Sequence, residues 1–173
     1  GPEEEAAVSE VIRSGWLTMG ADTQAFEAEF ATFTGTKHAL AVTNATAGLH
    51  LACLALGVGA GDEVIVPSLT FVASANAIRY TGAKAVFADI ESPDWLCVSP
   101  QAIEASITPR SKAIMVVHYA GYACDMPAIL EIARKHGLVV IEDAAHAVGA
   151  SLQGKPWAPG AISAVTPFLA TRT

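Results

Sequence analysis

The 173-residue sequence has few charged side chains, which make up 16% of it, against about 25% in ordinary soluble domains. It has no apolar run of the roughly 18 residues that would indicate a membrane span, because Gly, Pro, Asn or a charge interrupts each one. It has no basic cluster, and its net charge of −7 disfavours binding to nucleic acid. Its acidic first residues lack the basic and apolar regions of a secretory signal. What is abundant is apolar side chain, 52% of residues, which excludes a disordered chain and predicts surface buried against a partner or against further chain.

Cysteine is also scarce. The three cysteines, Cys53, Cys97 and Cys124, are widely spaced and form no C-x-x-C pair. This pattern argues against a disulfide framework and against a structural metal site. Small buried thiols are typical of proteins in the reducing cytosol, so we expect a cytoplasmic location.

Four short apolar runs are rich in β-branched residues and do not alternate with polar positions: residues 64–67, 85–88, 113–117 and 138–141. Such runs are typical of parallel strands covered on both faces. Residues 39–42 are an earlier candidate strand. Helical patterns cover residues 4–14, 23–33, 46–56, 71–80, 99–106 and 125–136, and the alternation predicts an α/β fold of three layers, α/β/α, with a mainly parallel sheet. Residues 149–157 predict a small hairpin, and residues 162–168 a further strand.

Ligands of open α/β sheets bind beyond the carboxyl ends of the strands, and this rule selects candidate residues. After the first candidate strand, residues 43–48 are small or polar and open a helix, which suits either a phosphate or an ordinary helix cap. After the next strand comes Phe71, which could lie over an aromatic ligand or belong to the core.

The last clear strand ends in Glu142-Asp143-Ala144-Ala145-His146. Asp143 could bind a protonated ring nitrogen through a charge-assisted hydrogen bond, or cap the following turn. His146 could act on the same ligand or be a structural imidazole. Asp89 and His118 also end strands, and we expect structural roles for them.

The glycines at residues 57–62 do not make a dinucleotide-binding fingerprint. Asp62 stands where the third glycine of G-x-G-x-x-G is required, and the segment follows a helix and precedes a strand, the reverse of the needed order. A helix C-cap and a tight turn explain these glycines better.

Four segments in this order resemble the DegT/StrS-type nucleotide-sugar aminotransferases, which are PLP-dependent enzymes of fold type I: SGWLT at 14–18, TAGLHL at 46–51, GDEVIVPSLTFVA at 61–73 and IEDAAH at 141–146. The resemblance implies that the chain is one partial PLP-binding large domain, truncated, with N-terminal helices in residues 1–35 and the sheet core in residues 36–173. The small C-terminal domain of the family would be absent. It further implies a homodimer, a nucleotide-sugar substrate, and an amino donor that is commonly glutamate.

The resemblance also assigns roles to the candidate residues. The turn at Ala45, Thr46 and Ala47 would bind the PLP phosphate through backbone N–H groups and the Thr46 hydroxyl. Phe71 would stack on the pyridine ring, and Asp143 would pair with the pyridinium nitrogen and keep it protonated. His146 would lie beside the cofactor, and residues 15–18 near the entrance of the active site.

One departure from the family concerns the lysine that binds the cofactor covalently. The family pattern resembles S-F-x-x-T-K-N, and the corresponding text here places Pro167 at the serine and Arg172 at the lysine. A guanidinium stays protonated and is not a competent amine nucleophile. Lys155 is the nearest lysine, but the predicted hairpin points it to solvent. We therefore expect that this chain does not transaminate by the usual route; the alternatives are noncatalytic binding of PLP or PMP, or a lysine-independent PMP enzyme that uses His146 as its base.

Overall fold

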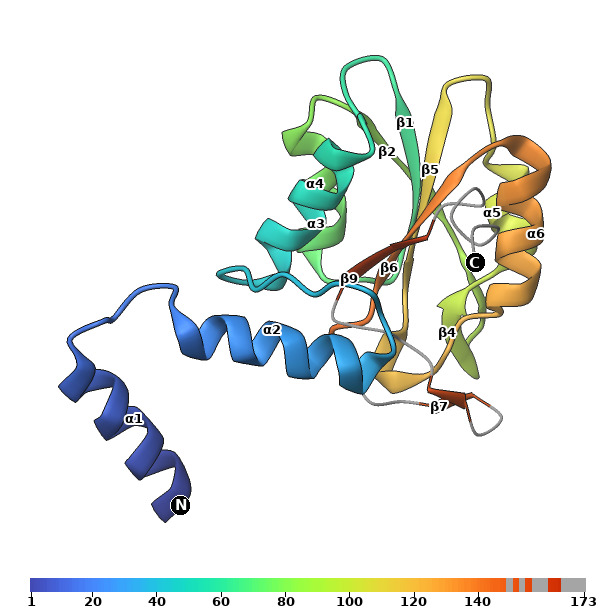
Figure 1. Cartoon of the computed structure of the whole chain (residues 1–173). Helices are drawn as coiled ribbons and strands as arrows, with labels where there is room; N and C mark the ends of the chain where they lie inside the picture. Colours follow the sequence, from blue (N-terminus) through green and yellow to red (C-terminus); the bar gives the residue numbers. More distant parts are fainter. Residues whose placement is uncertain (149–150, 153–154, 157–161, 166–173) are drawn as a thin grey trace. The chain divides into compact units, whose positions relative to one another are not determined.

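The computed structural model describes residues 1–148, 151–152, 155–156 and 162–165 (Figure 1). The chain divides into two compact units, residues 1–41 and residues 42–173. In the described part of the chain, no helix has both the length and the apolar character that a membrane crossing requires.

The first unit contains two helices, α1 (Pro2–Ser14) and α2 (Ala21–Thr34), which confirms the two helices predicted there. Helix α1 begins with a proline and three glutamates, which suit the positive end of the helix dipole. Both helices end at a glycine in the left-handed region, Gly15 at φ 71° and Gly35 at φ 69°.

The second unit is built on a five-stranded sheet with the order β2-β1-β5-β6-β9. Its first four members are parallel neighbours and coincide with the four predicted strands. Strand β9 pairs with β6 in the antiparallel direction. The bounds are β1 (Glu63–Pro67), β2 (Lys84–Ala88), β5 (Ser111–Val117), β6 (Val139–Asp143) and β9 (Ile162–Val165).

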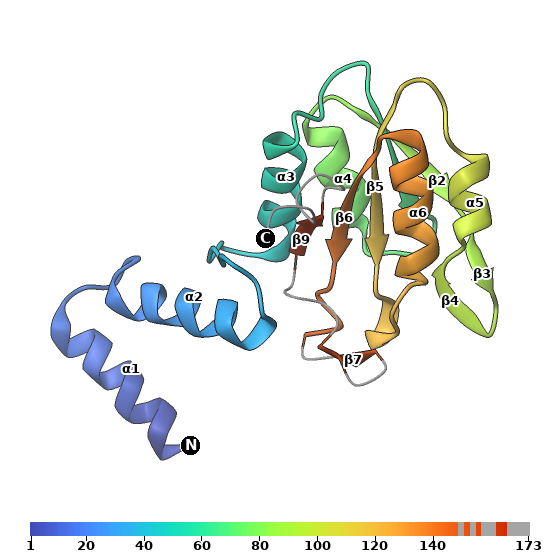
Figure 2. The ribbon, with the colours of Figure 1, turned by 45° about the vertical axis from the view of Figure 1, so that its right-hand side comes forward.

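Helices cover both faces of this sheet, as the fold class predicted. Figures 1 and 2 show α3 (Ala45–Ala55) and α4 (Val72–Tyr80) on one face, and α5 (Pro100–Ala105) and α6 (Met126–His136) on the other. Successive residues of β1 face opposite layers: Val64 and Val66 pack in the core under α3 and α4, and Ile65 packs in the core under α5 and α6. All five residues of β1 are buried, which explains why the strand shows no polar alternation.

Smaller elements complete the second unit. A hairpin of β3 (Ile90–Ser92) and β4 (Trp95–Val98) was not predicted from the sequence. A second antiparallel pair, β7 (Ser151–Leu152) and β8 (Lys155–Pro156), matches the predicted hairpin, whose turn lies outside the described residues. A short 3₁₀ turn, η1 (Tyr119–Gly121), follows β5. All three cysteines are buried and free, as expected.

The predicted strand at residues 39–42 is wrong, because these residues form no strand. The backbone N–H of Ala41 donates to the side chain of Glu27 at 2.7 Å instead of to a neighbouring strand. Leu40 is 73% exposed, so its apolar character does not signal a buried strand here.

The connections reverse direction between β1 and β5. The chain leaves β1 through α4 to reach β2 on one side, and then returns past β1 to reach β5 on the other side. The segments after β1 and β5 therefore lead to opposite faces of the sheet. In open α/β folds, ligands bind at the carboxyl edge beside such a switch point.

Candidate functional site

The predicted site residues of the second unit gather at this carboxyl edge. Phe71 follows β1, the η1 turn follows β5, and Asp143 ends β6. Helix α3 runs back toward the start of β1, so its own N-terminus lies at the same edge (Figure 1). The fold therefore brings together segments that are up to about 100 residues apart in sequence.

Asp143 is a buried carboxylate whose partners among the described residues are neutral. It is 7% exposed, and its Oδ1 atom accepts the backbone N–H of Ala145 at 3.2 Å. Its Oδ2 atom accepts the hydroxyl of Ser74, on α4, at 3.3 Å. No Lys, Arg or His in the described residues forms an ion pair with it. Asp143 therefore caps the turn that follows β6, as one of the two interpretations predicted. This cap uses a neutral N–H, so the Asp143 carboxylate has no cationic partner among the described residues.

A buried pair braces the backbone beside Asp143. His118 is completely buried, and its Nε2 atom lies 3.1 Å from Oε2 of Glu142. Its Nδ1 atom accepts the backbone N–H of Cys124 at 3.2 Å, so the ring proton of the neutral imidazole is on Nε2 and is donated to Glu142. The backbone N–H of His118 also donates to the carbonyl of Asp143 at 3.1 Å. The structural role expected of His118 is thereby confirmed.

Asp89 likewise has a structural role. Its carboxylate accepts the backbone N–H of Ile90 at 2.8 Å and the hydroxyl of Ser68 at 3.3 Å. It therefore fixes the turn after β2.

Phe71 is the N-cap residue of α4, and its side chain is 72% exposed. Assigning it to the core is therefore wrong. A large exposed aromatic ring at the carboxyl edge is available to cover a flat ligand. Ser74 lies one helical turn further along α4, on the same side of the helix, so α4 links the exposed ring to the Asp143 carboxylate.

The N-terminus of α3 has free donors. The Asn44 side chain caps the helix by accepting the N–H of Ala47 at 2.9 Å. The N–H groups of Ala45 and Thr46, and the Thr46 hydroxyl, have no hydrogen-bond partner among the residues that the structure describes. Unpaired N–H groups and the helix dipole favour an anion at this position.

His146 is exposed and is held by the turn after β5. Its Nδ1 atom accepts the N–H of Ala120 at 3.3 Å, and its ring meets the Tyr119 ring edge-on, with centroids 6.0 Å apart. Ala120 has a left-handed φ of 53°, unusual for a residue with a side chain. A Cβ atom on Gly121 would lie 3.3 Å from the His146 carbonyl, so glycine suits this close approach.

Arg172 and Pro167 lie outside the described residues, as does the side chain of Lys155. The glycines near residue 60 end α3 and form the following turn, as predicted: Gly57, at φ 69°, comes directly after the C-cap residue Leu56, and Gly61 has φ 93°.

Ser74 was missed by the sequence reasoning. Its partner Asp143 is 69 positions away, and no local pattern marks such a pair.

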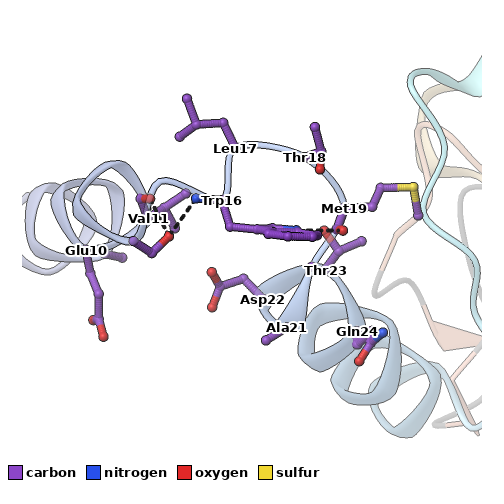
Figure 3. Close-up of a pocket in the computed structure, with 13 residues that line it drawn as sticks. Glu10, Val11, Trp16, Leu17, Thr18, Met19, Ala21, Asp22, Thr23 and Gln24 are labelled. Atoms are coloured by element: carbon purple, nitrogen blue, oxygen red, sulfur yellow. Dashed lines mark hydrogen bonds between the residues drawn. The ribbon is translucent and has the colours of Figure 1, made fainter.

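The first unit contains a pocket of about 860 Å³, lined by residues 7–24 (Figure 3). Its wall includes Trp16, whose Nε1–H donates to the Met19 carbonyl at 3.0 Å. A Cβ atom on Gly20 would lie 2.5 Å from the Trp16 ring, so only glycine permits this packing. Trp16, Leu17 and Met19 are each more than 60% exposed.

Comparison with known proteins gives the whole chain a family. Residues 1–173 match the DegT/DnrJ/EryC1/StrS aminotransferase family. The chain belongs to this family. DegT/StrS aminotransferases are PLP-dependent, and the arrangement described above, one sheet between two layers of helices, is the type I fold of their large domain.

Three solved DegT/StrS-like structures illustrate the similarity. DesV from S. venezuelae has 40% identity and a TM-score of 0.82, over 89% of this chain and 42% of DesV. An aminotransferase from Psychrobacter cryohalolentis has 42% identity and a TM-score of 0.83, over 90% of this chain and 40% of that one. NtdA from Bacillus subtilis, solved with bound PMP, has 35% identity and a TM-score of 0.81, over 86% and 34%. The chain thus spans about two fifths or less of each relative's length.

The residues at the carboxyl edge fit the DegT/StrS cofactor, pyridoxal phosphate. The unpaired N–H groups of α3 suit its phosphate, and the exposed Phe71 ring suits its flat pyridine. The buried Asp143 carboxylate, which has no cationic partner in the described chain, suits a protonated ring nitrogen.

Proposed function

We propose that this chain binds pyridoxal phosphate at the carboxyl edge of its sheet, as part of an aminotransferase that acts on a keto group of a nucleotide-linked sugar. Residues 1–173 are then part of the PLP-binding large domain, with N-terminal helices in 1–35 and the sheet core in 36–173. Glutamate is the expected amino donor. The observation that carries the proposal is Asp143, a buried carboxylate that has only neutral donors around it in the described structure.

Each residue has a distinct task in this proposal. Thr46 and the N–H groups of Ala45 and Ala47 bind the phosphate, and Ala47 does so by exchanging its Asn44 acceptor for a phosphate oxygen. Phe71 covers one face of the ring. Asp143 accepts the N–H of the protonated ring nitrogen. His146 belongs to the surroundings of the site.

The cofactor, when bound, supplies an electron sink at which an amino group is taken up and released. Asp143 supports that chemistry by keeping the ring nitrogen protonated. The sequence places Arg172 where the family's lysine is expected, and a guanidinium does not replace the amine. We therefore propose that this chain holds PLP or PMP noncovalently and does not transaminate alone.

Titration of the 173-residue chain with PMP, followed by ligand fluorescence, tests the cofactor. We expect saturable binding that Thr46→Val weakens, because the variant loses the hydroxyl at the phosphate turn. Thr32→Val is the matched control: its hydroxyl donates to Ala28 within α2, away from the proposed contacts. An absence of binding to the wild-type chain would contradict the cofactor proposal.

Borohydride reduction of the chain with PLP, followed by peptide mapping, tests the noncovalent state. We expect no stoichiometric labelling. Labelling of any lysine with one PLP per chain would contradict the proposal, because it would show that a lysine outside the family pattern binds the cofactor covalently.

A lysine-independent reaction on PMP is the second candidate, because His146 is exposed and uses only its Nδ1 atom in the hydrogen bond to Ala120. Because Nδ1 accepts this N–H, the proton of the neutral ring is on Nε2, and His146 serves as a base only if it releases the Ala120 N–H and frees the Nδ1 lone pair. If the chain shows turnover with PMP, His146→Ala must abolish it; retained turnover would exclude this role.

We also propose a cytosolic homodimer. Large apolar side chains lie exposed on the second unit, including Leu51, Leu54 and Phe87, and burial against a second copy would stabilise the assembly. Sedimentation at micromolar concentration should show self-association. A clean monomer would contradict the proposal.

A further inference from the structure

Ser74 connects helix α4 to the end of strand β6 through a buried hydroxyl. The side chain is completely buried, and its Oγ atom lies 3.3 Å from Oδ2 of Asp143. On its other side, Oγ lies 2.8 Å from Oγ1 of Thr70. Thr70 precedes the helix by two residues and Ser74 is its third residue, so the beginning of α4 is tied to Asp143.

The proton positions in this chain of hydrogen bonds follow from the donor inventory. An ionised carboxylate can only accept, so the single hydroxyl proton of Ser74 is donated to Asp143. Ser74 Oγ must then act as the acceptor toward Thr70. The direction is fixed: Thr70 donates to Ser74, and Ser74 donates to Asp143.

The two neutral donors restrain the Asp143 side chain. Ala145 N–H contacts Oδ1 and Ser74 contacts Oδ2, so one donor holds each oxygen. A carboxylate has about four lone-pair positions, which leaves acceptor capacity for a ligand N–H. A lysine or arginine at this position would neutralise the carboxylate. Ser74 carries no charge, so it holds the carboxylate in place and leaves its charge unbalanced.

We propose that Ser74 is a positioning residue for the cofactor: it holds Asp143 in the rotamer that meets the ring nitrogen. The inference rests on the proposed function for its ligand. It also explains why Phe71 and Ser74 belong to one helix. The same first turn of α4 sets the position of the ring face and, through Asp143, of the ring nitrogen.

The first test needs no ligand. Three-bond couplings between backbone nitrogen and Cγ of Asp143 report its χ1 rotamer in solution. We expect one rotamer in the wild-type chain and averaging in Ser74→Ala, with a smaller change in Thr70→Val. Ser106→Ala, which removes a hydroxyl donated to Ala102, is the control. An unchanged coupling in folded Ser74→Ala would overturn the proposal.

The second test compares PMP with its carbocyclic analogue, in which a C–H replaces the ring nitrogen. Ser74→Ala should weaken PMP binding about 2- to 12-fold, the range for one neutral hydrogen bond, and should leave binding of the analogue unchanged. Equal losses for both ligands would show a general packing defect and overturn the positioning role. If the wild-type chain binds no PMP, the proposed function fails, and the rotamer measurement alone decides the role of Ser74.

Discussion

Glu63 and Asp143 are buried carboxylates at opposite ends of the same sheet, and their surroundings differ. Glu63 begins β1 and is 2% exposed; Asp143 ends β6 and is 7% exposed. Glu63 contacts Arg110 at 2.7 Å and Lys84 at 3.3 Å, and it accepts the Thr108 hydroxyl. Asp143 has only the hydroxyl of Ser74 and the N–H of Ala145 among the described partners.

This difference indicates that the Glu63 carboxylate has a structural role, whereas the Asp143 carboxylate is available to a ligand. Thr108, and then Arg110, hold the pKa of Glu63 at about 2, so this carboxylate stays ionised and its charge is already balanced. An ionised Asp143 would be a buried negative charge with no cation among its described partners, an arrangement that stabilises a fold poorly and binds a cationic ligand well. Three variants test this comparison.

Asp143→Asn should have the largest effect. Losing a charge-assisted hydrogen bond to the ring nitrogen, worth about 1.5–3 kcal/mol, lowers PMP affinity about 10- to 150-fold. The urea midpoint should not fall, because the variant no longer buries an unbalanced charge. Asp94→Asn, at an exposed turn, is the control. Unchanged affinity, measured by fluorescence titration, would show that the Asp143 carboxylate does not bind the ligand.

Glu63→Gln should do the opposite, weakening the fold and leaving PMP affinity unchanged. The pKa of Glu63 is lowered in the fold, from 4.5 to about 2. Its stabilising contribution is therefore present above pH 4.5 and is lost as the pH falls toward 2. The urea midpoints of variant and wild type should differ at pH 7 and converge in that window. Glu131→Gln, from the exposed pair with Arg134, should show little difference at any pH.

Phe71→Leu should have the smallest effect. Aromatic stacking contributes about 0.5–1.5 kcal/mol, so PMP affinity should fall about 2- to 12-fold. Stability should not change, because the ring is 72% exposed. Phe33→Leu, which alters an exposed phenylalanine of α2, should change neither quantity. A loss of stability in Phe71→Leu alone would mean that the ring packs more than its exposure indicates.

Most of the sheet could be predicted from the sequence, because a strand buried on both faces is a continuous run of apolar residues. The four parallel strands are continuous apolar runs, and α6 is marked at both ends, by the Asp125 cap and by Gly137 at φ 66°. The β3–β4 hairpin was missed because its strands are short, irregularly paired and only partly buried, so they leave no continuous apolar run. Residues 39–42 have the composition of a strand, but the backbone N–H of Ala41 donates to the Glu27 side chain and not to a neighbouring strand.

At the site, sequence position alone indicated Phe71, Asp143 and the turn before α3, since each follows a strand or precedes a helix. It could not tell a core phenylalanine from an exposed one, because that depends on where α4 packs. It could not find Ser74 or the Glu63–Arg110 pair, whose contacts span 69 and 47 positions. Such contacts arise only once the sheet is assembled.

The Asn44 cap has a consequence for phosphate binding at the N-terminus of α3. Because this side chain already occupies the Ala47 N–H, the first turn of α3 is formed before any anion arrives. An incoming phosphate therefore does not have to supply the free energy of ordering that turn, and it displaces one weak acceptor in exchange for a charged one. The helix end would thus be preorganised for the proposed phosphate, which favours affinity by reducing the entropy lost on binding.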